Sequence, residues 1–333
     1  MKQFLKKLIV FAILFLAILL CQKLLDRHTP WYWGNETLAA KLDFLSTIQD
    51  DYDAFFIGSS HTFRGTNPAI FDSITGLKSF NMGVPGMAAP ELYMAVEHLI
   101  KKKRDTTSKQ VFFVELTRVN EAIIKDGNTI RRNYWMNLDS YSFGIHYFSE
   151  GWNLRSMYRY TSSFLHFQTK FGLGRPQYQS IDSVYDSQFP LGPEKNGYHS
   201  LKDQFKAGIN RPSIINRRIR YEKDTSVIIR KAQYMLSEPG LGIRVRQAHL
   251  ERVVDLILKA EKKGVNIIFV RMPIQEDIWS TFQEIPKKNR LDLGDPKKYA
   301  ELYQAKYFSD KGHLNRLGAS TYTTNLADIF KQK

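Results

Sequence analysis

The chain has 333 residues, of which 43% are hydrophobic and 13% aromatic, and it contains one cysteine. This composition is typical of a packed globular protein and excludes a disordered chain. A single cysteine also excludes an intrachain disulfide and a zinc site built on several thiolates. The formal net charge of +15 favours anionic partners but does not identify them.

The first residues have the pattern of a membrane-targeting segment. Met1–Lys7 contains three lysines, and Leu8–Cys21 is an unbroken apolar run. Because no small residues occupy the positions that signal peptidase requires, we expect an uncleaved anchor helix, with a cleaved signal as the alternative. The lysines would stay cytoplasmic and the body would be extracytoplasmic, on the periplasmic or cell-surface side. The sequence thus predicts a signal-anchor helix and flank over residues 1–30, followed by one domain over residues 31–333.

Strand and helix patterns alternate along the body of the chain. Short apolar runs bounded by turn residues predict strands, and apolar positions at helical spacing predict helices. This alternation indicates an α/β layer fold with a parallel sheet. The expected strands cover residues 54–57, 77–82, 110–116 and 265–270, and the expected helices begin at Asn35 and cover 90–103, 245–263 and 316–331.

The periodic pattern is lost from about residue 128 to residue 240. Because the α/β pattern resumes afterwards, we interpret this stretch as a large insertion rather than a separate domain. Its aromatic and basic side chains would bind an anionic glycan or lie against lipid headgroups; alternatively, the aromatics are core residues and the arginines are solvated. These residues are Tyr134, Trp135, Trp152, Arg155, Tyr158, Arg159 and Tyr160.

A serine pair follows the first predicted strand. Ligands of open α/β sheets lie at the carboxyl ends of the strands, so the hydroxyl of Ser60 is well placed for a nucleophile. The alternative is that Ser59 or Ser60 only caps the next helix, as serine often does.

A carboxylate and a histidine precede the last predicted helix. Asp310 stands three residues before His313, in a turn that contains a glycine, and none of the other seven histidines has this arrangement. The carboxylate can accept from Nδ1–H and leave Nε2 as a general base, which requires a neutral imidazole and predicts a histidine-like titration of activity between pH 5 and 8. The alternative is a capping aspartate beside an exposed histidine.

The turn after the second predicted strand supplies the glycines Gly83 and Gly86. A glycine at this place lets a backbone N–H point into the crevice, as an oxyanion hole requires. The alternative is an ordinary turn between a strand and a helix.

The order of these motifs resembles that of the SGNH (GDSL-type) hydrolases. The match covers Ala54–Gly86 and Tyr307–Ala319. The resemblance implies a three-layer, flavodoxin-like fold and chemistry that needs neither a cofactor nor a metal ion. It places the nucleophile on Ser60, the oxyanion donors on the Ser60 and Gly86 backbone, with Gly83 as the neighbouring candidate, and the acid and base on Asp310 and His313.

The third motif of the family is altered in this chain. Members usually follow the third strand with GxND, whose asparagine donates to the oxyanion. Here the strand is followed by Thr117-Arg-Val-Asn120, so Asn120 is displaced by about one residue and the glycine is missing. Asn120 is therefore the candidate third donor.

The Gly58-Ser-Ser motif, the expected anchor and the end of the strand before Pro273 are most similar to one branch of that superfamily. It contains the D-alanine transfer protein of teichoic-acid modification and proteins that acetylate exported polysaccharides. The resemblance implies an esterase or O-acyltransferase that acts on an acylated carbohydrate or cell-envelope polymer beside a membrane-bound acyltransferase. The alternative is a non-catalytic, anchored partner of such an enzyme. No nucleic-acid motif accompanies the positive charge, so we expect no nucleic-acid partner.

Three further residues are candidates for contact with substrate. His61 and Arg64 lie one and four residues beyond the expected nucleophile, and Arg271 stands at the end of a strand. The alternatives are that His61 packs near the turn and that Arg271 forms an ion pair.

Overall fold

The computed structural model describes most of the chain in two compact units. The described residues are 2–26, 31–32, 34–105, 107–119, 136–169, 190–206, 212–237, 245–273, 275 and 278–332. One unit comprises residues 1–39 and 121–178, and the other comprises residues 40–120 and 179–333. The stretch that the sequence marks as an insertion, 128–240, is therefore divided between the two units.

The described elements alternate between strands and helices, as the sequence predicts. The strands are β1 (Ala54–Ile57), β2 (Ser79–Asn81), β3 (Gln110–Glu115), β4 (Val265–Arg271) and β5 (Arg290–Asp292). The α-helices are α1 (Lys2–Asp26), α2 (Glu36–Leu45), α3 (Ser60–Gly65), α4 (Pro68–Thr75), α5 (Glu91–Lys102), α8 (Leu138–Ser149), α9 (Leu154–Thr169), α10 (Leu201–Lys206), α11 (Pro212–Lys223), α12 (Val227–Ser237), α13 (Gln247–Glu261), α14 (Trp279–Glu284) and α15 (Arg316–Lys331). Short 3-10 helices cover Gln49–Asp51, Lys287–Asn289, Ala300–Tyr303 and Ala305–Tyr307.

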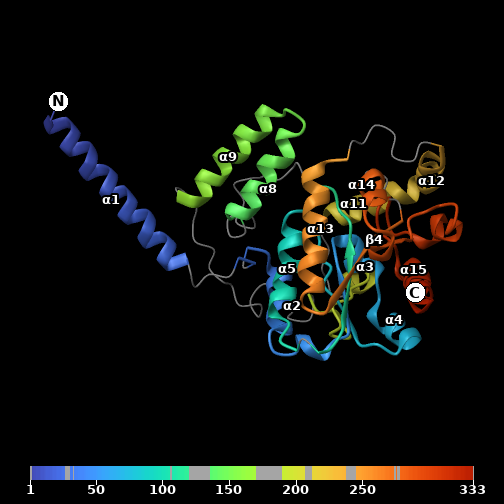
Figure 1. Cartoon of the computed structure of the whole chain (residues 1–333). Coiled ribbons are helices and arrows are strands. Elements are labelled where there is room, and N and C mark those ends of the chain that lie inside the picture. The colour runs from blue at the N-terminus through green and yellow to red at the C-terminus, as the bar shows by residue number, and fades with distance from the viewer. Residues whose placement is uncertain are drawn as a thin grey trace. The chain divides into compact units, whose positions relative to one another are not determined.

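The second unit is built on a five-stranded parallel sheet (Figure 1). Its strand order is β2-β1-β3-β4-β5, the order of flavodoxin-like doubly wound sheets. The predicted α/β class with a parallel sheet is thus confirmed. In this order β1 and β3 are neighbours, but the chain continues from β1 to β2 on one side and from β3 to β4 on the other. Ligands of such sheets bind at the carboxyl ends of the two strands where the direction changes.

Aromatic side chains form the core on one face of the sheet. Phe56 of β1 and Phe113 of β3 are paired in register and stack with ring centroids 5.3 Å apart. Phe71 of α4 and Tyr322 of α15 are buried in the same cluster. Helices α4 and α15 therefore cover this face, and α15 also packs on α3, which carries Ser60.

The alternate residues of the strands face the opposite side. Phe55 and Phe112 are paired and lie edge to face with centroids 5.4 Å apart. Helices α5 and α13 pack against each other, and α13 packs on β4. Figure 1 shows these two helices side by side on this side of the sheet.

Helices occupy much of the stretch in which the sequence shows no clear periodicity. In the first unit α8 and α9 pack against each other, and Tyr160, 1% exposed, lies between Tyr141 and Phe148. Trp152 and Tyr158 are 85% and 75% exposed, and Arg155 and Arg159 are also exposed. Tyr160 is therefore a core residue, whereas the side chains of the other four are accessible to solvent. Tyr134 and Trp135 lie outside the described residues.

The apolar N-terminal run is a continuous helix, α1. Across the described ranges, the length and apolarity needed to cross a membrane do not occur together in any helix.

Candidate active site

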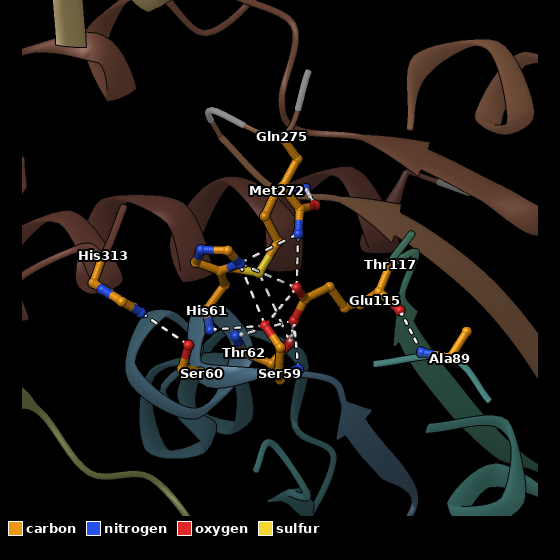
Figure 2. Close-up of polar contacts among 10 residues, drawn as sticks. All are labelled: Ser59, Ser60, His61, Thr62, Ala89, Glu115, Thr117, Met272, Gln275 and His313. Carbon is orange, nitrogen blue, oxygen red and sulfur yellow. Dashed lines mark hydrogen bonds and ion pairs between the residues drawn. The ribbon is translucent and has the colours of Figure 1, made fainter. Parts of the chain in front are cut away.

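The turn between β1 and α3 separates the roles of the two serines. Ser59 is the N-cap of α3, and its Oγ accepts from the His61 N–H at 3.2 Å. Ser60 is the first helical residue, and its Oγ lies 2.8 Å from Nε2 of His313 (Figure 2). Ser59 therefore caps the helix, and the Ser60 hydroxyl faces the histidine.

The turn before α15 orients His313. Nδ1 of His313 lies 2.9 Å from both carboxylate oxygens of Asp310. Oδ1 of Asp310 also accepts from the N–H groups of Gly312 and His313, at 2.8 and 2.9 Å. Since the carboxylate can only accept, these contacts assign the proton to Nδ1 and leave Nε2 as the acceptor for Ser60. The structure thus brings Ser60, His313 and Asp310 together in the order that a serine nucleophile requires.

Burial keeps this histidine neutral. Asp310 and His313 are 1% and 6% exposed. Burial lowers the pKa of His313 to about 4, and the Asp310 carboxylate opposes this shift only in part. Burial alone would raise the pKa of Asp310. The hydrogen bonds from His313 and Gly312 outweigh this effect and hold the Asp310 pKa well below its usual range. At neutral pH the site therefore contains an imidazole that can take a proton.

This shift gives an expected pH profile. Protonated His313 cannot accept the Ser60 proton, so kcat/KM for ester hydrolysis should rise with pH through about 4 and be level between pH 6 and 8. The rise between pH 5 and 8 expected from the sequence alone is thus moved to lower pH by burial. Stopped assays between pH 3 and 8 with p-nitrophenyl acetate, read after neutralisation, measure the midpoint. A midpoint near 6.5, the ordinary value of an exposed histidine, would contradict this assignment.

Glu115 is the main feature of the site that sequence reasoning missed. It is the last residue of β3 and is 2% exposed. Its Oε2 accepts from Ser59 N–H at 2.7 Å, from Thr62 N–H at 3.3 Å and from Thr62 Oγ1 at 2.6 Å. Its Oε1 accepts from Ser59 Oγ at 2.7 Å and from Gln275 Nε2 at 2.6 Å (Figure 2). One buried carboxylate therefore fixes the residues on both sides of Ser60.

These hydrogen bonds keep Glu115 ionised. Burial alone would raise the pKa of its carboxyl, but the hydrogen bond from His61 and the charge that His61 carries when protonated, together with the hydrogen bonds from Thr62 and Ser59, lower it to about 2. Gly58 makes room for this carboxylate, because an added Cβ would lie 2.4 Å from Glu115 Oε2. A signal was present in the sequence: a glutamate in an otherwise apolar, buried strand needs partners.

A buried lysine holds the turn that follows β2. Nζ of Lys41 donates to the carbonyl oxygens of Asn81, Gly83 and Gly197 at 2.7 to 2.8 Å. Burial lowers the pKa of Lys41 well below its usual value. The sequence pattern gave no sign of this contact, since Lys41 lies among the apolar positions of a predicted helix.

The two candidate oxyanion glycines differ in their surroundings. The N–H of Gly83 donates to Oδ1 of Asn81 at 2.7 Å, and an added Cβ on Gly83 would lie 2.3 Å from Phe63 N. Gly83 thus permits close packing, and its donor is used internally. Gly86 is exposed and has φ of +75°, in a turn closed by Met87 N–H and Val84 O. Within the described residues, neither the Gly86 nor the Ser60 N–H donates to a protein acceptor.

The other candidates from the sequence are the substrate-contact residues Arg271, Arg64 and His61 and the third oxyanion donor, Asn120. Arg271 is 3% exposed and forms a two-point ion pair with Asp292 at 2.8 and 2.9 Å, which joins β4 to β5. Arg64 is 5% exposed, and its charge contributes to the low pKa of His313. His61 lies beside His313, with ring centroids 5.2 Å apart. Asn120 lies outside the described residues.

Histidine, cysteine and carboxylate side chains do not gather in a metal-binding group of three anywhere in the described ranges. Comparison of the sequence with models of protein families and with curated proteins finds no match.

Proposed function

We propose that this protein is a serine acyl-ester hydrolase or O-acyltransferase of the SGNH type. The observation that carries the proposal is the hydrogen-bonded series Ser60 Oγ, His313 Nε2, His313 Nδ1 and Asp310, in which 253 positions separate the serine from the histidine. The flavodoxin-like strand order and the place of Ser60 at the start of α3, shortly after the carboxyl end of β1, support the same assignment.

The residues carry a two-step acyl transfer. His313 Nε2 takes the Ser60 proton while Oγ attacks the ester carbonyl, and the same proton then passes to the departing alcohol. The acyl group remains on Ser60 Oγ. In the second step His313 removes a proton from water or from an acceptor hydroxyl, whose oxygen attacks the acyl carbon, and the proton returns to Ser60. The backbone N–H groups of Ser60 and Gly86 are the proposed oxyanion donors.

The substrate we propose is an acylated carbohydrate or cell-envelope polymer outside the cytoplasm. The lysines before the apolar N-terminal run support an extracytoplasmic body. In the first unit, exposed Trp152 and Tyr158 supply rings for stacking on sugars, and Arg155 and Arg159 supply charge for an anionic polymer. A membrane-bound acyltransferase is the proposed partner.

Covalent labelling tests the nucleophile directly. A fluorophosphonate reacts with an activated serine, so the intact protein should gain one label, and peptide mapping should place it on Ser60. Heat-denatured protein should remain unlabelled, and Ser73→Ala, which removes an exposed serine of α4, should label as the natural protein does. Absence of label, or label on another residue, would reject the proposed nucleophile and leave the non-catalytic partner as the better hypothesis.

A further inference from the structure

A second pair of histidine and carboxylate lies beside the nucleophile. Nδ1 of His61 is 3.2 Å from Oε1 of Glu115, just as His313 is paired with Asp310. Ser59 Oγ and Gln275 Nε2 also lie 3.3 Å from this nitrogen. The Ser59 hydroxyl donates its one proton to Oε1 of Glu115, and Gln275 donates one of its two amide hydrogens to the same oxygen at the shorter distance of 2.6 Å. Because Glu115 is an ionised acceptor, the contacts assign a proton to Nδ1 of His61 and make Nε2 an acceptor in the neutral ring.

The other nitrogen of His61 faces the site. The side chain is 30% exposed, and in the described part of the chain no residue forms a hydrogen bond with Nε2. An added Cβ on Gly312 would lie 3.9 Å from this nitrogen, so Nε2 is directed to the turn that carries His313. Figure 2 shows the His61 ring between His313 and Glu115, next to Ser60. A hydrogen-bond acceptor held in place by a buried carboxylate is thus available to a substrate on Ser60.

We propose that His61 Nε2 accepts a hydrogen bond from a second hydroxyl of the acyl acceptor, so that the site selects vicinal diols such as those of sugars. This inference rests on the proposed function and names the acceptor that it uses. His313 removes the proton from the attacking hydroxyl, the acyl group moves from Ser60 Oγ to that oxygen, and the proton returns to Ser60. His61 transfers no proton in this step. It orients the acceptor through the neighbouring hydroxyl.

The test compares two acyl acceptors, of which only one has a second hydroxyl that can donate a hydrogen bond. With p-nitrophenyl acetate as acyl donor, release of p-nitrophenol measures acylation, and mass spectrometry measures acetyl transfer to ethylene glycol or to 2-methoxyethanol. The methyl ether cannot donate from its second oxygen. Per attacking hydroxyl, we expect the natural protein to prefer ethylene glycol by about fivefold, the effect of one hydrogen bond.

Two variants of His61 give the expected contrast. His61→Phe keeps a ring but removes the acceptor, and the preference should fall to about one, with acylation reduced less than transfer to the diol. His61→Gln keeps an acceptor atom and should retain part of the preference. If His61→Phe prefers ethylene glycol over 2-methoxyethanol as strongly as the natural protein does, the role of His61 is overturned but the proposed function is not. Equal losses of acylation and transfer in His61→Phe would also overturn it. No release of p-nitrophenol by the natural protein would overturn the proposed function as well.

Discussion

Replacing Ser60 with alanine is expected to lower kcat for ester hydrolysis by about 10⁵-fold, because the residual rate would come from binding and the oxyanion donors alone. The free energy of unfolding should change by less than about 1 kcal/mol, since the lost side chain is partly exposed and alanine is favourable in a helix. Among the described residues the Ser60 hydroxyl bonds only to His313, so its removal leaves the turn intact. Turnover of p-nitrophenyl acetate and urea unfolding measure the two effects.

The neighbouring serine provides the matched control. Ser59→Ala removes the N-cap and the 2.7 Å hydrogen bond from Ser59 Oγ to Glu115. It should lower the free energy of unfolding by about 1–2 kcal/mol and the rate by no more than about 10²-fold, through a displaced nucleophile. The two variants thus have opposite profiles. If Ser60→Ala destabilised the protein as Ser59→Ala does and kept its activity, Ser60 would be a structural residue.

The main strands could be predicted because their sequences are strongly biased. The apolar runs that became β1, β3 and β4 are buried on both faces, as parallel strands between two helical layers must be. The last helix was predicted with its observed bounds, Arg316–Lys331. By contrast, β5 has three residues with a charge at each end, so its sequence lacks the pattern of a strand. Its place depends on pairing with β4 and on the ion pair of Arg271 with Asp292.

One missed helix did have signals at both ends. Asn67 caps α4, Pro68 occupies its first turn, and Gly76 follows its end with φ of +76°. These are standard boundary residues of a helix. The segment between them is short, so its periodicity alone gave little indication of a helix.

The site could be predicted only as far as local motifs extend. Ser60 follows a strand, and Asp310 and His313 share one turn, so each motif is visible in the sequence. The 2.8 Å contact between Ser60 and His313 depends on how α15 packs on α3, which no local pattern records. The partners of Glu115 were hidden for the same reason, because Ser59, Thr62 and Gln275 belong to other parts of the chain.

Glu115, the last residue of β3, holds the turn that carries Ser60. Its carboxylate fixes the backbone before and after Ser60 and also orients His61. In the described structure it therefore sets the position of the nucleophilic turn, while Asp310 orients the base. A change at Glu115 should consequently affect folding and activity together, unlike a change at Ser60.

Replacing Glu115 with alanine is expected to lower the free energy of unfolding at pH 7 by about 3–5 kcal/mol, because it leaves several buried donors without an acceptor. These donors are the N–H and hydroxyl groups of Ser59 and Thr62, with Gln275. Urea unfolding measures the loss. Glu284→Ala, which removes an exposed glutamate of α14, should change stability by less than about 0.5 kcal/mol.

The difference in the free energy of unfolding between the natural protein and Glu115→Ala should depend on pH. This dependence distinguishes stabilisation by the ionised carboxylate from stabilisation by packing. Because the pKa of Glu115 is lowered from 4.5 to about 2 in the folded protein, its contribution is full above pH 4.5 and is lost as pH falls towards 2. The gap in stability between the natural protein and Glu115→Ala should therefore be constant from pH 7 to 5 and narrow at pH 3. A gap that stays the same at pH 3 would mean that the side chain stabilises the turn by filling space. In that case its negative charge would not be what holds Ser59 and Thr62.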